Sequence, residues 1–511
     1  MEFIKKNINT LLLTLYISLI WISYTYLNFY SQKFFWVIVL EIILVSAIVS
    51  YIAILAIKDK DLKQTSPKHI GKRITVLAVV AAVSLAYVLY RYYTYYPGGF
   101  SGDSDIQYLQ AMDVNPYNDW HPAWHTFVFF RLPLLVTGER SFIVLLQMIY
   151  FAFTLGYMGM VIYKHTNIQA VILTTAYILL NPYTGNIIIY PWKDVGFAIA
   201  CCLAATMTFE IYMSREWGSW WRMMLLGLVL ANATLFRHNG ILFTAALLVA
   251  LFFFLSKKQA IIMTVTFVLF LVIVKGPVYG LLGVEKPEQR TIETMGLPIT
   301  IIGNVAREAP DKLDGETAEF IYSIAPRECW ENQYVIGDFN SVKFLYADRG
   351  AAEVYGKKKI VMMALRCFRY APAEAWKGAI ALTDTVYGLD YYQSDADPYY
   401  TVLPYDREVD ADREALINSH NGAFIFSIFK YSGSVGMAML LTLMVILAKS
   451  DLSSFRDWKR LFLGLPIFVH NFGTMLLLSG PDVRFFFLTY LVCPLIIVMM
   501  LLRRGAVSGK E

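Results

Sequence analysis

The chain has 511 residues, of which 57% are hydrophobic and 16% are charged, with a mean hydropathy of +0.50 and a formal net charge of +5. Soluble domains hold about 25% charged residues, whereas here the apolar residues fall in runs of about 20, the length that crosses a hydrocarbon core. This composition excludes a soluble enzyme, a disordered chain and a coiled coil. It predicts an all-α polytopic membrane protein whose surroundings are the lipid bilayer. No Lys/Arg-rich arm indicates a nucleic-acid partner.

The hydropathy pattern predicts about twelve transmembrane helices. In chain order they cover 8–29, 34–57, 74–94, 141–163, 168–189, 195–213, 222–239, 241–256, 260–281, 424–448, 461–479 and 485–502. The first run is too long for a signal-peptide core and is expected to stay as an uncleaved span. The segments on the side of both termini hold 20 Lys and Arg, against seven in the short segments opposite. Because these residues concentrate in cytoplasmic loops, both termini are predicted to be cytoplasmic.

Two segments are too polar to span the membrane, and both fall on the outer side of this topology. They are 95–140 and the stretch from 282 to about 420, which carries 23 Asp and Glu against 15 Lys and Arg. Within the second, 357–383 mixes apolar and charged residues at helical spacing, as helices at a membrane surface do. The predicted division is two additional N-terminal helices, a seven-span module with an acidic first outer loop, an extracytoplasmic α-rich domain and three C-terminal helices, at 1–73, 74–281, 282–423 and 424–511.

Five polar clusters fall at the predicted outer face, each at the end of a span or in the loop beside it. They contain Asp103 and Asp105; Asp119 and His121; Trp192, Lys193 and Asp194; Arg237, His238 and Asn239; and Asp482 and Arg484. A tight turn needs only Gly or Asn, so ionisable side chains at these positions cost desolvation and indicate a function. Taken together, acids, bases and phosphate-binding cations at one face predict an active site at the membrane–water boundary.

The carboxylates and histidines among these residues also have simpler interpretations. Asp103 and Asp105 form a D-x-D pair that could deprotonate a hydroxyl or hold a divalent ion such as Mg²⁺ or Mn²⁺, or merely form a solvated Asx turn. Asp119 could cap the helix that follows it. His121 and His125 are spaced by four residues and could ligate a metal, but a hydrogen-bonding role is favoured because no third ligand stands nearby in the sequence.

The cationic clusters have structural alternatives as well. Arg237 could reach lipid headgroups or offer a guanidinium fork to a phosphate. Trp192 could be an interfacial anchor. Lys193 and Asp194 could form an ion pair with each other, and Asp482 and Arg484 could form a surface ion pair.

A carboxylate base beside clustered cations suits group transfer from a lipid phosphate carrier to a hydroxyl acceptor. The carboxylate would take the acceptor proton, and Arg and Lys would stabilise the phosphate that departs on its lipid. A positioned base contributes about 10²–10⁴-fold and one charge stabiliser about 10²–10³-fold. Neither is sufficient alone, so the hypothesis requires both parts.

On these motifs the chain resembles GT-C fold glycosyltransferases. Its layout is similar to that of protein O-mannosyltransferases and aminoarabinose transferases, and a closer likeness is to an uncharacterised bacterial multi-pass family. The likeness covers most of the chain from residue 74 onward. The motifs that carry it are Ser-Gly-Asp-Ser-Asp at 101–105, Asp-Trp-His-Pro at 119–122, Pro-Trp-Lys-Asp at 191–194, Arg-His-Asn-Gly at 237–240 and Asp-Val-Arg-Phe at 482–485. The polar stretch from Gly296-Leu297-Pro298 to Asp338 also looks similar.

The resemblance implies a GT-C fold, a polyprenyl-phosphate sugar donor and inversion at the anomeric carbon. It implies that the catalytic base is Asp103 or Asp105, with Asp103 favoured, and that Arg237 and Lys193 meet the donor phosphate. Many relatives have adjacent Asp-Glu where this chain has D-x-D, which leaves the base and the use of a metal open. The acceptor would be an envelope glycan, teichoic acid or protein at the outer face of a bacterial cell membrane.

Two other functions stay open on the sequence. A transporter or flippase of a lipid-linked glycan would place ionisable residues near mid-span, whereas here they gather at one interface. A non-catalytic scaffold for envelope assembly would use the 282–423 domain to bind a partner, and would leave the clustered outer charges unexplained.

Overall fold

A computed structural model describes residues 2–31, 33–62, 69–94, 96, 98–214, 219–287, 291–389, 434–450, 452 and 455–502. Every regular element within these ranges is a helix. The α-helices are α1 (Glu2–Phe29), α2 (Phe35–Lys58), α3 (Ile70–Thr94), α4 (Gly102–Ala111), α5 (Ala123–His125), α6 (Leu132–Thr137), α7 (Ser141–His165), α8 (Ile168–Leu180), α9 (Pro182–Ile187), α10 (Lys193–Ser214), α11 (Trp220–Phe236), α12 (Ile241–Phe252), α13 (Lys257–Ile273), α14 (Tyr279–Leu281), α15 (Thr291–Thr294), α16 (Gly296–Glu308), α17 (Gly315–Ile324), α18 (Arg327–Asn332), α19 (Asn340–Lys343), α20 (Ala351–Tyr370), α21 (Pro372–Tyr387), α24 (Val435–Lys449), α25 (Phe455–Met475) and α26 (Phe487–Leu501).

Seven helical stretches among the described residues are long and apolar enough to cross a membrane, which confirms a multi-pass membrane protein in outline. They are Asn7–Phe29, Phe35–Lys58, Ile70–Tyr93, Ser141–His165, Lys193–Met213, Lys257–Leu281 and Val483–Leu501, and each coincides with a predicted span. The other five predicted spans fall on shorter apolar helices, at Ile168–Leu180, Trp220–Phe236, His238–Phe252, Val435–Lys449 and Leu461–Met475. The first ten residues of the predicted span 424–448 lie outside the described residues. The total of twelve spans stays a prediction.

The predicted span 168–189 is wrong as a single helix. The chain forms α8 over 13 residues, about 20 Å, and then starts the six-residue α9. Asn181 adopts an extended conformation between them and its side chain accepts the N–H of Tyr183 at 3.0 Å. Proline disfavours helical geometry in the residue before it, so Pro182 ends α8 and occupies the first position of α9.

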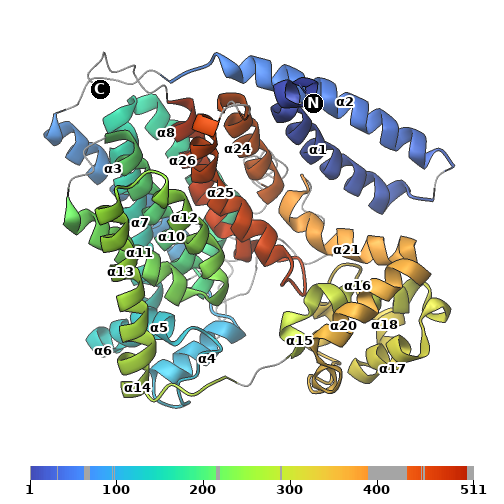
Figure 1. Cartoon of the computed structure of the whole chain (residues 1–511). Helices are drawn as coiled ribbons and strands as arrows, with labels where there is room; N and C mark the ends of the chain where they lie inside the picture. The colour runs from blue at the N-terminus through green and yellow to red at the C-terminus, as the bar shows by residue number, and fades with distance from the viewer. Residues whose placement is uncertain are drawn as a thin grey trace.

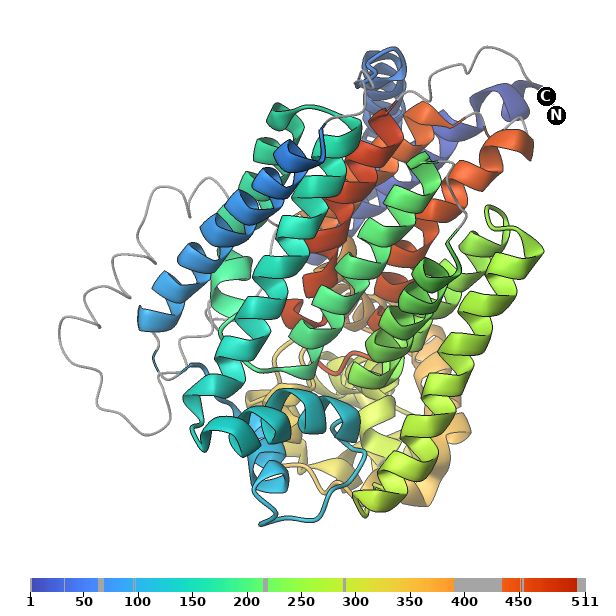
Figure 2. The ribbon, with the colours of Figure 1, turned by 90° about the vertical axis from the view of Figure 1, so that its left-hand side faces the viewer.

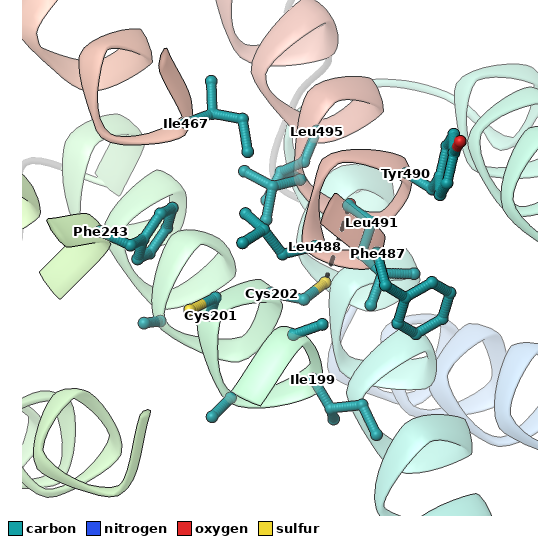
Figure 3. Packing of buried hydrophobic residues seen from close by; sticks show 14 of the residues in the cluster. Ile199, Cys201, Cys202, Phe243, Ile467, Phe487, Leu488, Tyr490, Leu491 and Leu495 are labelled. Carbon is teal, nitrogen blue, oxygen red and sulfur yellow. Dashed lines mark hydrogen bonds between the residues drawn. The ribbon is translucent and has the colours of Figure 1, made fainter. Parts of the chain in front are cut away.

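The described helices outside the 291–387 region form one bundle around α10 and α26 (Figures 1 and 2). Of the membrane-length window in α10, 89% is buried, against 17% in α13 at the periphery, because α7, α11 and α26 pack around α10. Figure 3 shows Cys202 of α10 facing Leu491 of α26. The Cys202 thiol lies 3.8 Å from the Leu491 carbonyl oxygen.

Small residues allow the peripheral helices to approach one another closely. A Cβ on Gly156 of α7 would lie 2.7 Å from the Leu77 carbonyl oxygen of α3, and one on Gly227 of α11 would lie 2.5 Å from the Met263 carbonyl oxygen of α13. Helices in membranes associate through such close packing, because lipid tails are as apolar as the side chains and supply no hydrophobic driving force. These glycines therefore fix the α3–α7 and α11–α13 pairs.

Helices α15 to α21 form a separate domain, called the outer domain after its predicted side of the membrane, around their own apolar core, which includes the fully buried Trp330. The Trp330 indole donates to the carbonyl oxygens of Ile321 and Ala325, both at 3.1 Å. Figure 1 shows this domain, together with α4, α5, α6 and α14, away from the bundle end where α1 begins. The opposite end gathers the start of α1 and the ends of α24 and α26, since Asn9 donates to Leu447 and Leu62 to Leu501. Predicted inner segments thus share one end; which side of the membrane that end faces stays a prediction.

Candidate functional site

The Asp103 carboxylate lies between two cations that come from distant parts of the chain. Asp103 occupies the first turn of α4, where the helix N-terminus favours a negative charge. Its Oδ2 lies 3.5 Å from Lys193 Nζ at the start of α10 and 3.4 Å from Arg484 Nη1, which precedes α26. The Asp103 side chain is 34% exposed, against 20% and 19% for the two cations. Three of the five predicted clusters therefore meet at one carboxylate.

The electrostatics of this site hold Asp103 in its ionised form. Burial raises the pKa of the Asp103 carboxyl, but Lys193, Arg484 and His121 together outweigh burial, so its pKa lies well below the ordinary value. The carboxylate is consequently charged at neutral pH and is a poor proton acceptor as long as both cations face it.

His121 is a second partner of Lys193, besides Asp103. Lys193 Nζ lies 2.9 Å from His121 Nδ1. Burial, with Lys193 next in importance, lowers the pKa of His121 to about 3. The ring is therefore neutral at physiological pH and its Nδ1 accepts a hydrogen bond from the ammonium group. The ring proton then resides on Nε2, a buried atom for which the described part of the chain offers no acceptor.

Asp105 faces a different cation, which the sequence did not single out. Arg140 Nη2 lies 2.7 Å from Asp105 Oδ1, and its guanidinium carbon lies 3.8 Å from the centre of the Phe100 ring. The signal available for Arg140 was its position as one of few cationic residues on the predicted outer side. The two carboxylates of the D-x-D pair thus have separate partners, since residues two apart in the first turn of α4 point in nearly opposite directions.

Arg484 is held by Asp482 and Trp192. Asp482 accepts the Arg484 backbone N–H at 3.0 Å and pairs with Arg484 Nε at 2.8 Å. The guanidinium carbon lies 4.9 Å from the centre of the Trp192 ring. Trp192 is 2% exposed, stacks on Tyr190 and donates to Ser101 Oγ at 2.8 Å. The interpretation of Trp192 as a lipid-facing anchor is therefore wrong, because its ring packs inside the site.

Arg237 and Asp194 form a buried ion pair beneath the Asp103 site. Their side chains are 7% and 0% exposed, which excludes a guanidinium at the lipid headgroups. Asp194 pairs with Arg237 and not with its chain neighbour Lys193, so the local-pair interpretation is wrong. Arg237 also donates to Asn239, whose amide donates to Thr474 Oγ1 at 3.0 Å. Phosphate binding by Arg237 stays a prediction. In the structure its side chain supports Asp194 and Asn239.

Asp119 belongs to a second polar network beside the site. Its Oδ1 accepts the N–H of Ala123 at 3.1 Å, which confirms the helix-capping interpretation, and the hydroxyl of Tyr279 at 2.9 Å. Its Oδ2 lies 3.2 Å from Lys275 Nζ, and its backbone carbonyl oxygen lies 2.6 Å from His238 Nε2. Lys275 stands in a π-helical turn, a distortion found often at functional sites.

The outer domain reaches the site through the loop that precedes Asp482. Asn340 donates its N–H to the Ser479 carbonyl oxygen at 3.2 Å, and Lys343 Nζ lies 3.1 Å from Ser479 Oγ. Asp338 lies against Gly480, where an added Cβ would stand 2.3 Å from the carboxylate. Burial, with the charge of Asp482 as a further cause, raises the pKa of Asp338 to about 6. In the sequence, Asp338 ends a polar stretch that resembles the family, but no role was predicted for this residue.

The described residues contain no group of three or more His, Cys, Asp or Glu side chains that could hold a metal ion. His125, predicted to hydrogen-bond, lies with its Nδ1 3.0 Å from Gln107 Nε2. Asp103 and Asp105 each face a cation of the protein, so as arranged they do not offer their oxygens jointly to one ion. Binding of Mg²⁺ or Mn²⁺ stays a prediction.

No family model, curated protein or solved structure matches this chain. The likeness to GT-C glycosyltransferases therefore stays a prediction from the sequence motifs, and the function has to be argued from the site.

Proposed function

We propose that this protein is a membrane glycosyltransferase of the GT-C type. It moves a sugar from a polyprenyl-phosphate carrier to a hydroxyl acceptor, with Asp103 as the general base. The observation that carries the proposal is the position of the Asp103 carboxylate within 3.5 Å of both Lys193 and Arg484. A base and two phosphate-type cations are the parts that such a transfer requires.

In the reaction, the acceptor hydroxyl oxygen attacks the anomeric carbon while Asp103 takes the hydroxyl proton. The bond between that carbon and the phosphate oxygen breaks, and its electron pair leaves with the polyprenyl phosphate. Lys193 and Arg484 stabilise the negative charge that grows on this phosphate. Asp105, held by Arg140, supports the first turn of α4 and is the alternative base.

Asp103 is weakly basic in the free protein, and binding of the donor phosphate would make it more basic. A phosphate bound to Lys193 and Arg484 draws both cations toward itself and away from the carboxylate. Asp103 then loses charge stabilisation and becomes a better proton acceptor. The base is thus activated only when the donor is in place, which suppresses proton transfer without a sugar to move.

The remaining predicted residues fit supporting roles in this scheme. Trp192 and Asp482 orient Arg484, and His121 orients Lys193. Asp119, Asp194, Arg237, His238 and Asn239 support the site through the ion pairs and hydrogen bonds described above. The site would face the outside of a bacterial cell membrane, and the acceptor would be an envelope glycan, a teichoic acid or a protein. A flippase and a membrane scaffold are the competing functions.

The test is sugar release by the purified protein in lipid nanodiscs, from a panel of polyprenyl-phosphate sugars. Asp103→Asn is expected to lower turnover by about 10²–10⁴-fold, with retained folding. Asp113→Asn is the matched control, because Asp113 follows the same helix, is 62% exposed and pairs with Arg131 instead. Its backbone has φ 57°, which asparagine tolerates.

Two outcomes would redirect the proposal. Activity that survives in Asp103→Asn but is lost in Asp105→Asn would move the base to Asp105. No turnover of any donor by the wild-type protein, with polyprenyl-phosphate binding intact, would favour the flippase or the scaffold.

A further inference from the structure

Helix α21 has two faces that meet different surroundings. One face packs on α16 in the core of the outer domain: Ala375 and Leu382 are buried, and a Cβ on Gly378 would lie 2.7 Å from the side chain of Asn304. At 100° per residue, Ala373, Trp376 and Ile380 lie on the opposite face.

That opposite face contacts the outer end of α1. The hydroxyl of Tyr26 donates to the Ala373 carbonyl oxygen at 3.1 Å, and Ser23 Oγ donates to the hydroxyl of Tyr387 at 3.3 Å. Figure 1 shows α21 next to α1, as the element of the outer domain nearest to the N-terminal helices. Trp376 lies between these two contacts along α21.

The α1 contact places α21 at the level of an aromatic cluster at the α1–α2 turn. The Tyr26 ring centre lies 4.5 Å from that of Tyr30 and 5.8 Å from that of Phe35. Beside them, Phe34 and Trp36 are 66% and 75% exposed. Both helices are long and apolar enough to span a membrane, and Tyr and Trp gather where such helices leave the hydrocarbon core.

At this level α21 and the preceding helix α20 together expose large apolar side chains: Trp376 comes from α21, and Leu365 and Tyr370 come from α20. Trp376 is 53% exposed and packs edge-to-face against Phe368 of α20, with ring centres 4.8 Å apart. Leu365, one turn before Phe368, is 55% exposed, and Tyr370 is 45% exposed. Exposure of this apolar surface to water is unfavourable, whereas an amphipathic helix at the headgroup boundary buries such a face in lipid.

We propose that α21 lies in the outer headgroup–acyl boundary of the bilayer and inserts Trp376 as its anchor. The ligand of this surface is the lipid of the membrane itself, and continuity with the aromatic cluster of α1 and α2 sets the depth. The contact holds the outer domain at a fixed depth relative to the bilayer. It therefore also positions the loop before Asp482, which this domain contacts through Asn340 and Lys343. The inference does not depend on catalysis.

The test is nitroxide labelling of the full-length protein in phosphatidylcholine nanodiscs, with accessibility to oxygen and to a water-soluble nickel chelate measured by EPR. The label is placed at Ile380→Cys in a Cys329→Ser background, since the other four cysteines are buried. Leu269→Cys on α13, 55% exposed, is the lipid reference. Glu319→Cys on α17, which Figure 1 shows far from α1, is the aqueous reference.

We expect the label at 380 to match the lipid reference, with high oxygen and low nickel accessibility. A label open to nickel would place α21 in water, and a label closed to both reagents would show that protein covers it; either result overturns the proposal. Trp376→Glu, added to the labelled protein, is expected to raise nickel accessibility, while Trp376→Phe is expected to leave it unchanged. An unchanged label in Trp376→Glu would refute the anchor.

Discussion

Arg484 Nη1 and Asp103 Oδ2 stand 3.4 Å apart, although Arg484 lies just before α26 and Asp103 lies in the first turn of α4. Their contact joins the segment that follows α3 to the turn that precedes α26. The same guanidinium is stacked on Trp192 and paired with Asp482, so three side chains contact it in the free protein. This arrangement makes Arg484 the most informative residue for testing the site.

Replacement of Arg484 separates charge from geometry. Arg484→Gln is expected to lower turnover by about 10²–10³-fold, because one charge stabiliser at the phosphate is lost. Arg484→Lys keeps the charge but loses the planar fork, and we expect an intermediate rate. The measurement is single-turnover sugar release. Arg327→Gln, in an exposed pair with Glu331 on the outer domain, is the control, and an equal loss there would contradict a specific role.

The Arg237–Asp194 pair is expected to matter for stability more than for chemistry. Removing one partner leaves a buried charge uncompensated, which costs about 3–5 kcal/mol. Arg237→Gln and Asp194→Asn should each lower the thermal unfolding temperature strongly. The double variant should lose less than the sum of the two, because neither charge is then stranded. Additive losses would show that the two side chains are not coupled in the folded protein.

The buried carboxyl of Asp338 is expected to make the stability of the contact between the outer domain and the loop at Gly480 depend on pH. Its pKa is about 6 in the folded chain, above the ordinary value of 3.8, mainly because it is buried and next because it lies near Asp482. Protonation therefore favours the folded state: the stability is fully present below pH 3.8 and is lost as the pH rises through about 6.

Asp338→Asn keeps an oxygen for the Asn340 N–H, which the carboxylate accepts at 2.9 Å, and removes the charge. We expect this variant to be more stable than the wild type by about 3 kcal/mol at pH 8 and to unfold like it at pH 4. Thermal unfolding followed by tryptophan fluorescence at both pH values is the measurement. A gain of equal size at pH 4 would assign the effect to packing instead of charge.

Local sequence was sufficient for most helices of this protein. Apolar runs of span length depend only on neighbouring residues, and so α1, α2, α3, α7 and α10 lie close to their predicted bounds. The failure at 168–189 was also local, because Asn181 and Pro182 carry the signal that breaks the span and hydropathy alone does not register it.

The composition of the site could be predicted from sequence, but its pairings could not. Polar residues at the ends of spans must come together at one face, because the hydrocarbon between the ends excludes them, and this brought the five clusters to the outer side of the predicted topology. Which acid meets which cation depends on how α4, α10 and the turn before α26 pack. As a result of that packing, Lys193 pairs with Asp103, Asp194 pairs with Arg237, and Asp105 pairs with Arg140. Such contacts join residues far apart in the chain, and only the tertiary structure decides them.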